Sequence, residues 1–310
     1  MAAPEFLTPL IPGRFRRNPV VMKELRGRMR GGKAFVILTI YLLLLSTAIS
    51  IVFLAFTASQ NPVGSSDVRQ VLGKAIFGMV VGMELFTVSF IAPALTSGAI
   101  SSEREHQTFD LLRTTLLSAR SFVLGKLFSS LFYIVLLLFA ALPLQSLAFL
   151  LGGVAIEEVL IGNLLLVITA TAFSAIGLFF SSITRRTLVS TVLSYALAII
   201  IVFGLPVFLL TGIALFDRML FGSGLPANVI AESILVVSGW VIVSLNPLAT
   251  AVVTQIILIE EQSAFYFAFP LGNGNTVPVL SPWISYAVIY LFLSSIMVWL
   301  SVRFVKRVDR

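Results

Sequence analysis

The sequence contains no cysteine and only one histidine, His106, among its 310 residues. These absences exclude disulfides, thiolate metal sites and a cysteine nucleophile, and they remove most histidine-based metal and acid–base chemistry. Charged residues are also scarce, at 11% of the chain against about a quarter in a typical soluble domain. Instead, 58% of the residues are hydrophobic and the mean hydropathy is +1.04. The composition predicts an all-α membrane protein with several spans.

Long apolar runs predict six transmembrane helices, each with roughly the 20 residues needed to cross a hydrocarbon core of about 30 Å. The predicted spans are residues 34–58, 75–100, 127–151, 161–183, 188–216 and 283–302. The predicted domains are therefore a leader over residues 1–33 and a six-helix membrane domain over residues 34–310.

Residues 217–282 are the least regular part of the membrane domain. Two apolar stretches, 229–245 and 248–259, meet at Asn246-Pro247 without a basic residue nearby. We expect two re-entrant or interfacial helices on the outer side of the membrane. An arrangement with eight spans would also leave both termini on the same side of the membrane, and it remains an alternative.

The distribution of basic residues predicts the orientation. In the six-span arrangement, all but three of the 21 Lys and Arg residues fall on the side of both termini, and the exceptions are Arg69, Lys74 and Arg218. Since cytoplasmic loops carry the excess of Lys and Arg, both termini are predicted to be cytoplasmic in a multi-pass protein of the cell (inner or plasma) membrane. The net charge of +7 follows the same loops and forms no patch for nucleic acid.

Two cytoplasmic segments have an amphipathic pattern. In the leader, Asn18-Pro19 starts a predicted helix with basic and apolar faces, which would lie on the headgroups of membrane lipids. In the loop over residues 101–126, Ser102 and Glu105 are spaced as a capping box. An apolar stripe of Phe109, Leu112 and Leu116 follows the box, and Ser118 can cap a second helix. Unless this loop is only a solvated connector, we expect both apolar faces to contact a partner protein.

Glu84 lies near the middle of the second predicted span, where a carboxylate is costly unless it is protonated or faces a polar interior. It is either a lining residue of a substrate or proton path or a packing residue at a helix or subunit interface.

The loop resembles the first cytoplasmic loop of ABC-2-type transporter permeases through Glu103-Arg104-Glu105, Thr108-Phe109-Asp110-Leu111-Leu112, Leu117-Ser118 and Gly125-Lys126. Further matches to the family are Asn18-Pro19, Lys23-Glu24-Leu25, Pro143, Leu151-Gly152-Gly153, Ser181-Ser182 and Asn246-Pro247. The chain departs from the family pattern at Gln107 and Leu116, where glycine and proline are common.

The resemblance implies a permease subunit without a nucleotide site of its own, usually for export. Two such subunits, as a homodimer or a heterodimer, would sit on two copies of a separate ABC ATPase that binds ATP and Mg. The loop would be the coupling helix, with Glu103, Arg104, Glu105, Thr108, Phe109, Leu112 and Leu116 as its contact residues. The leader would be the connecting helix, represented by Lys23, Glu24, Leu25 and Arg26.

The residues themselves agree that this chain binds no ATP through a P-loop, because Gly125-Lys126 lacks the preceding glycine and the following Ser or Thr. Two other classes remain open. A proton-coupled secondary transporter would use Glu84 as its carrier and need no ATPase. A membrane-embedded enzyme would need clustered acids, histidines or metal ligands at one depth, and the predicted spans offer only Glu84.

Overall fold

The computed structural model describes residues 24, 27, 32–58, 66–109, 118–208, 211–212, 229–260, 263–270 and 276–307. Within these residues, six helices are long and apolar enough to cross a membrane. They are α3 (Gly32–Ala58), α4 (Ser66–Thr96), α7 (Ala119–Leu151), α8 (Ile156–Ile183), α9 (Thr187–Ile199) with the π-helical turn η2 (Ile200–Gly204), and α13 (Pro282–Arg307). The prediction of a helical, multi-span membrane protein is therefore confirmed.

Several helices begin earlier than the apolar runs do. α4 begins at Ser66, α7 at Ala119 and α8 at Ile156, each several residues before its predicted span. For α7 the reason is local: the Ser118 hydroxyl accepts a hydrogen bond from the Ser121 amide at 3.2 Å and caps the helix, as predicted. The polar first turns extend the helices beyond their apolar segments.

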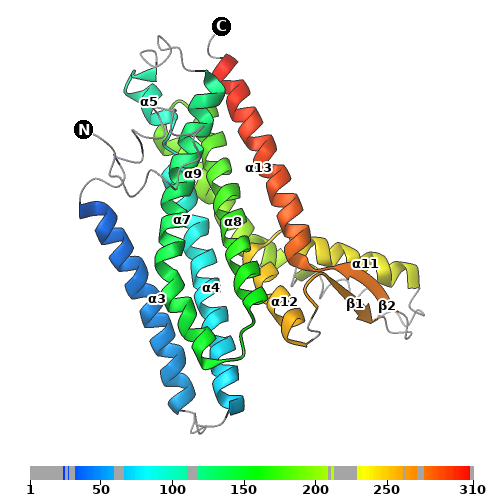
Figure 1. The fold of residues 1–310 in the computed structure, drawn as a ribbon. Helices are drawn as coiled ribbons and strands as arrows, with labels where there is room; N and C mark the ends of the chain where they lie inside the picture. The colour runs from blue at the N-terminus through cyan, green and yellow to red at the C-terminus, as the bar shows by residue number, and fades with distance from the viewer. Residues whose placement is uncertain are drawn as a thin grey trace.

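The bundle is built around α8, which packs against α4, α7, α9 and α13 (Figure 1). The packing of α8 against α4 at Gly177 requires a glycine, because a Cβ atom there would lie 2.2 Å from the Thr96 hydroxyl. α3 lies on the flank against α4 and α7 and leaves large apolar side chains such as Phe35 and Leu54 exposed. In a membrane protein such a face meets lipid or another subunit.

One end of the bundle holds the short helix α5 (Ser101–Glu105), the start of α7, the end of α8, the start of α9 and the end of α13 (Figure 1). We call it the α5 end. The opposite end holds the starts of α4 and α8 and the end of α7. Which end faces the cytoplasm stays a prediction.

The predicted break at Asn246-Pro247 is present. Helix α11 (Val229–Val243) is followed by α12 (Pro247–Glu260), and the apolar parts of the pair are bent by 117°. The Asn246 side chain holds the bend, because its Nδ2 donates to the carbonyls of Ile201 and Val202 at 2.7 and 3.0 Å. Its Oδ1 caps α12 by accepting from the Ala249 amide at 2.8 Å. The depth of this pair in a bilayer stays a prediction.

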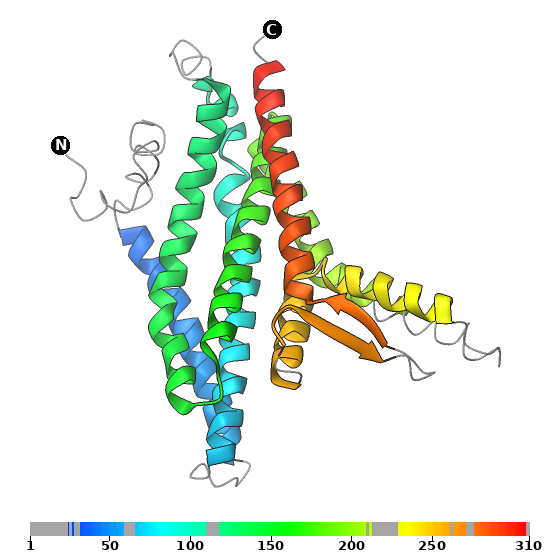
Figure 2. The same cartoon turned by 45° about the vertical axis from the view of Figure 1, so that its right-hand side comes forward.

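A feature that the sequence did not predict is a two-stranded antiparallel hairpin of β1 (Tyr266–Pro270) and β2 (Thr276–Leu280). With α11 it projects sideways from the bundle (Figure 2). Trp240 of α11 stacks on the Phe267 ring at 6.0 Å between centroids and donates from Nε1 to the Leu280 carbonyl at 2.6 Å. The region over 217–282 therefore contains β-structure as well as helices, and the prediction of an all-α fold applies only to the membrane spans.

Candidate functional site

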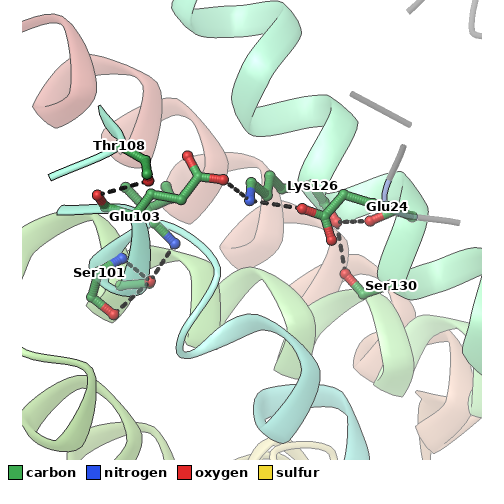
Figure 3. A network of polar contacts seen from close by, with 9 residues as sticks. Glu24, Ser101, Glu103, Thr108, Lys126 and Ser130 are labelled. Atoms are coloured by element: carbon green, nitrogen blue, oxygen red, sulfur yellow. Dashed lines mark hydrogen bonds and ion pairs between the residues drawn. The ribbon is translucent and has the colours of Figure 1, made fainter. Parts of the chain in front are cut away.

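At the α5 end, one buried lysine joins three segments that are distant in the sequence. Lys126 lies two turns into α7 with its side chain 5% exposed, and its Nζ donates to Glu24 Oε1 at 2.9 Å. The same Nζ also pairs with the carboxylate of Glu103 on α5 (Figure 3). We call these three residues the Lys126 cluster. The cluster ties the leader and the loop to the third long helix through charge-assisted hydrogen bonds, which are stronger than neutral ones.

The next two residues of α5 contact the turn between α8 and α9. Arg104 Nη1 donates to the Ser182 carbonyl at 2.8 Å. Glu105 Oε2 accepts from the amide and the hydroxyl of Thr187 at 3.2 and 2.6 Å. A carboxylate in this place satisfies a free amide at the start of α9 and suits the positive end of the helix dipole. Glu103, Arg104 and Glu105 therefore contact three different helices of the bundle.

The backbone of α5 is fixed as well. The Ser181 hydroxyl oxygen accepts hydrogen bonds from the amides of Ile100 and Ser101 at 2.9 and 3.0 Å. Thr108, also predicted as a contact residue, donates from its hydroxyl to the Glu103 carbonyl at 3.2 Å (Figure 3). The start of the loop is thus a fixed part of the bundle end.

The predicted capping box is wrong. The residue that precedes α5 is Ile100, without a side-chain cap, and the Glu105 carboxylate binds Thr187 in place of the Ser102 amide. The free amide at the start of α9 competes for that carboxylate, and this competition is invisible to a pattern within one helix. The predicted short amphipathic helix does not continue from the capping box to Phe109, because α5 ends at Glu105 and Gln107 follows with a φ of 56°. Its remaining part, over residues 110–117, lies outside the described residues.

Phe109 is the one residue of the predicted apolar stripe that the structure describes. It is 7% exposed, and its ring meets Phe122 edge-on at 6.2 Å between centroids. The Arg104 guanidinium lies over the same ring at 5.3 Å, within cation–π range. The apolar area of Phe109 is thus covered by its own chain. Five other predicted contact residues lie outside the described residues: Lys23, Leu25, Arg26, Leu112 and Leu116.

The polar groups of this site are not all used. Glu103 Oε2 and the Arg104 atoms Nε and Nη2 are buried and have no hydrogen-bond partner among the described residues. A buried charged group without a partner is costly, so such atoms call for an explanation. They mark the α5 end as a site where further polar contacts would be favourable.

Glu84 belongs to a second polar group within the bundle. Its side chain is fully buried on α4, and its Oε2 accepts from Gln145 Nε2 of α7 at 2.7 Å. The Gln145 carbonyl oxygen accepts in turn from Asn163 Nδ2 of α8 at 3.0 Å. The buried Tyr41 hydroxyl of α3 lies beside the carboxylate. We call Glu84, Gln145 and Asn163 the Glu84 network; it links the three helices α4, α7 and α8.

The sequence analysis did not assign the partners of these carboxylates. Lys126, Gln145 and Asn163 are polar residues on otherwise apolar helices, and that is a usable signal, because such residues are expected to pair inside a bundle. Ser181 and Thr187 gave no such signal. Across the described part of the chain, no group of three His, Asp or Glu residues could hold a metal ion.

A scan of the sequence against protein-family models finds no matching family, and a search of the curated proteins finds no match.

Proposed function

We propose that the chain is the membrane-spanning permease subunit of an ABC transporter, which forms the substrate path and couples it to a separate ATPase, for export. The ATPase, in two copies, would bind ATP and Mg, and a second permease subunit would complete the transporter. The resemblance of the loop to ABC-2-type permeases motivates the proposal.

One observation carries the proposal. Residues that resemble the family in four separate segments meet at one end of the bundle: Glu24, Glu103 to Glu105, Lys126 and Ser181-Ser182. A coupling element needs such an arrangement, because a displacement of the loop reaches the spans only through fixed contacts. Here the contacts run from α5 to α7, α8 and α9.

The structure changes the roles expected within the coupling loop. Phe109 is already covered, so its apolar area is expected to hold the loop in place and not to bind the ATPase. Leu112 and Leu116 remain the candidates for direct apolar contact with the ATPase. Glu105 is exposed and joins α5 to the start of α9, so its expected role is to transmit movement.

The test begins with mild-detergent purification of the tagged chain and identification of the ATPase that accompanies it. Glu105→Gln weakens the contact with Thr187 without touching a buried group, so the complex is expected to stay assembled while ATP hydrolysis loses its response to bound substrate. Glu157→Gln is the matched control, because Glu157 is an exposed carboxylate at the opposite end. Purification without any ATPase, or normal coupling in Glu105→Gln, would refute the proposed role.

The Glu84 network supports a second candidate, a proton-coupled secondary transporter. A fully buried carboxylate inside the bundle is a candidate proton site. Transport by the purified chain in vesicles under a proton gradient, without an ATPase, and its loss in Glu84→Gln would favour this candidate. Transport that needs ATP and survives Glu84→Gln would exclude it.

A further inference from the structure

A cavity of about 560 Å³ lies between α4, α8 and α12, in the half of the bundle opposite α5. Its volume is within the range of about 300–1,000 Å³ that is usual for ligand sites. Its deep walls are apolar, with Phe77 and Val81 from α4 and Leu165 from α8. The wall on α4 runs from Val71 to Gly82, roughly 16 Å along the helix axis at about 1.5 Å per residue. Such a slot suits a hydrocarbon chain.

The rim on α12 shows from where a ligand would enter. Val252, Ile256 and Ile259 line the cavity and are 59%, 46% and 38% exposed. On a membrane-spanning bundle, exposed apolar side chains at this place face lipid. An occupant would therefore come from the bilayer.

Polar groups line the part of the same cavity that is nearest to the helix starts. Glu158, 8% exposed, uses Oε1 to accept from the Ala155 amide at 3.2 Å, but its Oε2 is buried without a partner among the described residues. The hydroxyl of Thr254, which is 2% exposed, is also buried without a hydrogen-bond partner among the described residues. Lys74 also lines the cavity. Because buried polar groups are rarely left unpaired, Glu158 and Thr254 point to a ligand that supplies hydrogen-bond donors. The positive charge of Lys74 in the lining of the same cavity suits an anionic group on that ligand.

We propose that this cavity, the α12 pocket, binds a membrane phospholipid whose head carries both a primary ammonium and a phosphate, with one acyl chain in the apolar slot. The ammonium donates to Glu158 and the phosphate accepts from Lys74. A choline head has no N–H to donate, and the glycerol head of phosphatidylglycerol offers the Glu158 carboxylate only neutral hydroxyl donors, which bind it less strongly than an ammonium does. Lipid binding at the α12 pocket requires no ATPase, so its test does not depend on the proposed function.

Native mass spectrometry of the detergent-purified full chain tests the proposal by titration with dioleoyl phosphatidylethanolamine, phosphatidylcholine and phosphatidylglycerol. We expect the ethanolamine lipid to bind about tenfold more tightly than the other two, as a charge-assisted hydrogen bond would give. Glu158→Gln keeps an oxygen for the Ala155 amide but loses the charge, so this preference should disappear. Glu157→Gln, at the exposed neighbouring carboxylate, should retain it.

A second pair of variants tests the slot. Gly82 lines the cavity, and a Cβ added there would meet nothing within 4 Å, so Gly82→Ala fits without a shift. Thermal unfolding of both variants checks that the larger side chain of Gly82→Leu leaves the fold intact. Gly82→Leu should fill the slot and abolish the tight lipid adduct, whereas Gly82→Ala should keep it. Equal binding of the three lipids, an unchanged preference in Glu158→Gln, or a Gly82→Leu variant that still binds lipid would overturn the proposal. So would a dimer of the chain that closes the rim and excludes lipid.

Discussion

The Lys126 cluster and the Glu84 network each centre on a buried ionisable side chain, but opposite charges balance Lys126 whereas a neutral amide balances Glu84. Lys126 lies between the carboxylates of Glu24 and Glu103, which come from segments outside the long helices. Glu84 is matched by Gln145, on another long helix. At the end of the bundle, the segments between the spans can place oppositely charged side chains next to each other. Inside the bundle, the partner of a polar side chain must lie on a neighbouring helix at the same depth.

The two clusters should therefore respond differently to mutation. Removing one member of a buried ion pair leaves an uncompensated charge, and this loss is much larger than the net stability that the pair itself provides. A carboxylate that is matched by an amide can be replaced by another amide at little cost. Mutation should therefore distinguish the charged contact of Lys126, which holds the leader and the loop on α7, from the neutral contact of Glu84, which holds α4 against α7.

The largest expected effect concerns the side of the membrane on which the Lys126 cluster lies. The chain has no native cysteine, so single-cysteine variants need no background removal. Cysteine at Arg186, exposed beside the contact of Glu105 with Thr187, should be protected from an impermeant maleimide in intact cells. Cysteine at Glu157, exposed at the opposite end, should react. The reverse pattern would invert the orientation and place the cluster outside.

The next effect is the stability of the cluster itself. Lys126→Gln removes the cation between two partly exposed carboxylates and should lower the free energy of unfolding by about 3 kcal/mol, the lower end of the range for a broken buried pair. Thermal unfolding of the purified chain measures this loss. Arg120→Gln is the control, because it removes an exposed cation from the same helix.

The double variant Lys126→Gln with Glu103→Gln sharpens that result, since one carboxylate is neutralised together with the lysine. It should be more stable than Lys126→Gln alone. Equal stability of the single and double variants would show that Glu103 is not the partner that matters.

A smaller effect is expected in the Glu84 network. Glu84→Ala removes the acceptor of Gln145 and should cost roughly 1–3 kcal/mol in the free energy of unfolding. Glu84→Gln keeps the shape and an acceptor oxygen, so unfolding should change far less. If Gln destabilises the chain as much as Ala does, the charge of Glu84 has a partner that the network does not contain.

The smallest effect distinguishes a true cap from a predicted one. Ser118→Ala removes the cap of α7 and should cost about 1 kcal/mol. Ser102→Ala should cost less, because Ser102 does not cap α5. Hydrogen exchange at the first turns of α5 and α7 would locate each change, and an equal loss in both variants would restore the capping box.

Local features of the fold could be predicted from the sequence. The spans follow from the length of the apolar runs, the start of α7 from Ser118, and the bend before α12 from an Asn cap followed by Pro. The β1–β2 hairpin was missed because its strands are short and each contains a proline, Pro270 or Pro278, which is unusual within a strand.

The contacts of the candidate site could not be predicted, because they join residues that no short window contains. Lys126 and Glu24 are 102 residues apart, and Glu84 and Gln145 are 61 apart. Glu105 is the clearest example. The capping-box pattern predicted that its carboxylate binds the Ser102 amide, whereas in the structure it accepts a hydrogen bond from Thr187, 82 residues later. A single sequence states which polar residues need partners, but not which partners the fold supplies.

The helix α9 with its π-helical turn is fastened at both ends by side chains from other segments. Glu105 holds Thr187 at one end, and Asn246 holds Ile201 and Val202 at the other, about 21 Å away at ~1.5 Å per residue. The helix α9 with its π-helical turn thus connects α5 to the start of α12 over a fixed length. A slip along its axis by a single residue, about 1.5 Å, would stretch the hydrogen bonds at both ends beyond their working distance. As long as these hydrogen bonds hold, a movement of α5 along that axis is therefore accompanied by a movement of the bend before α12.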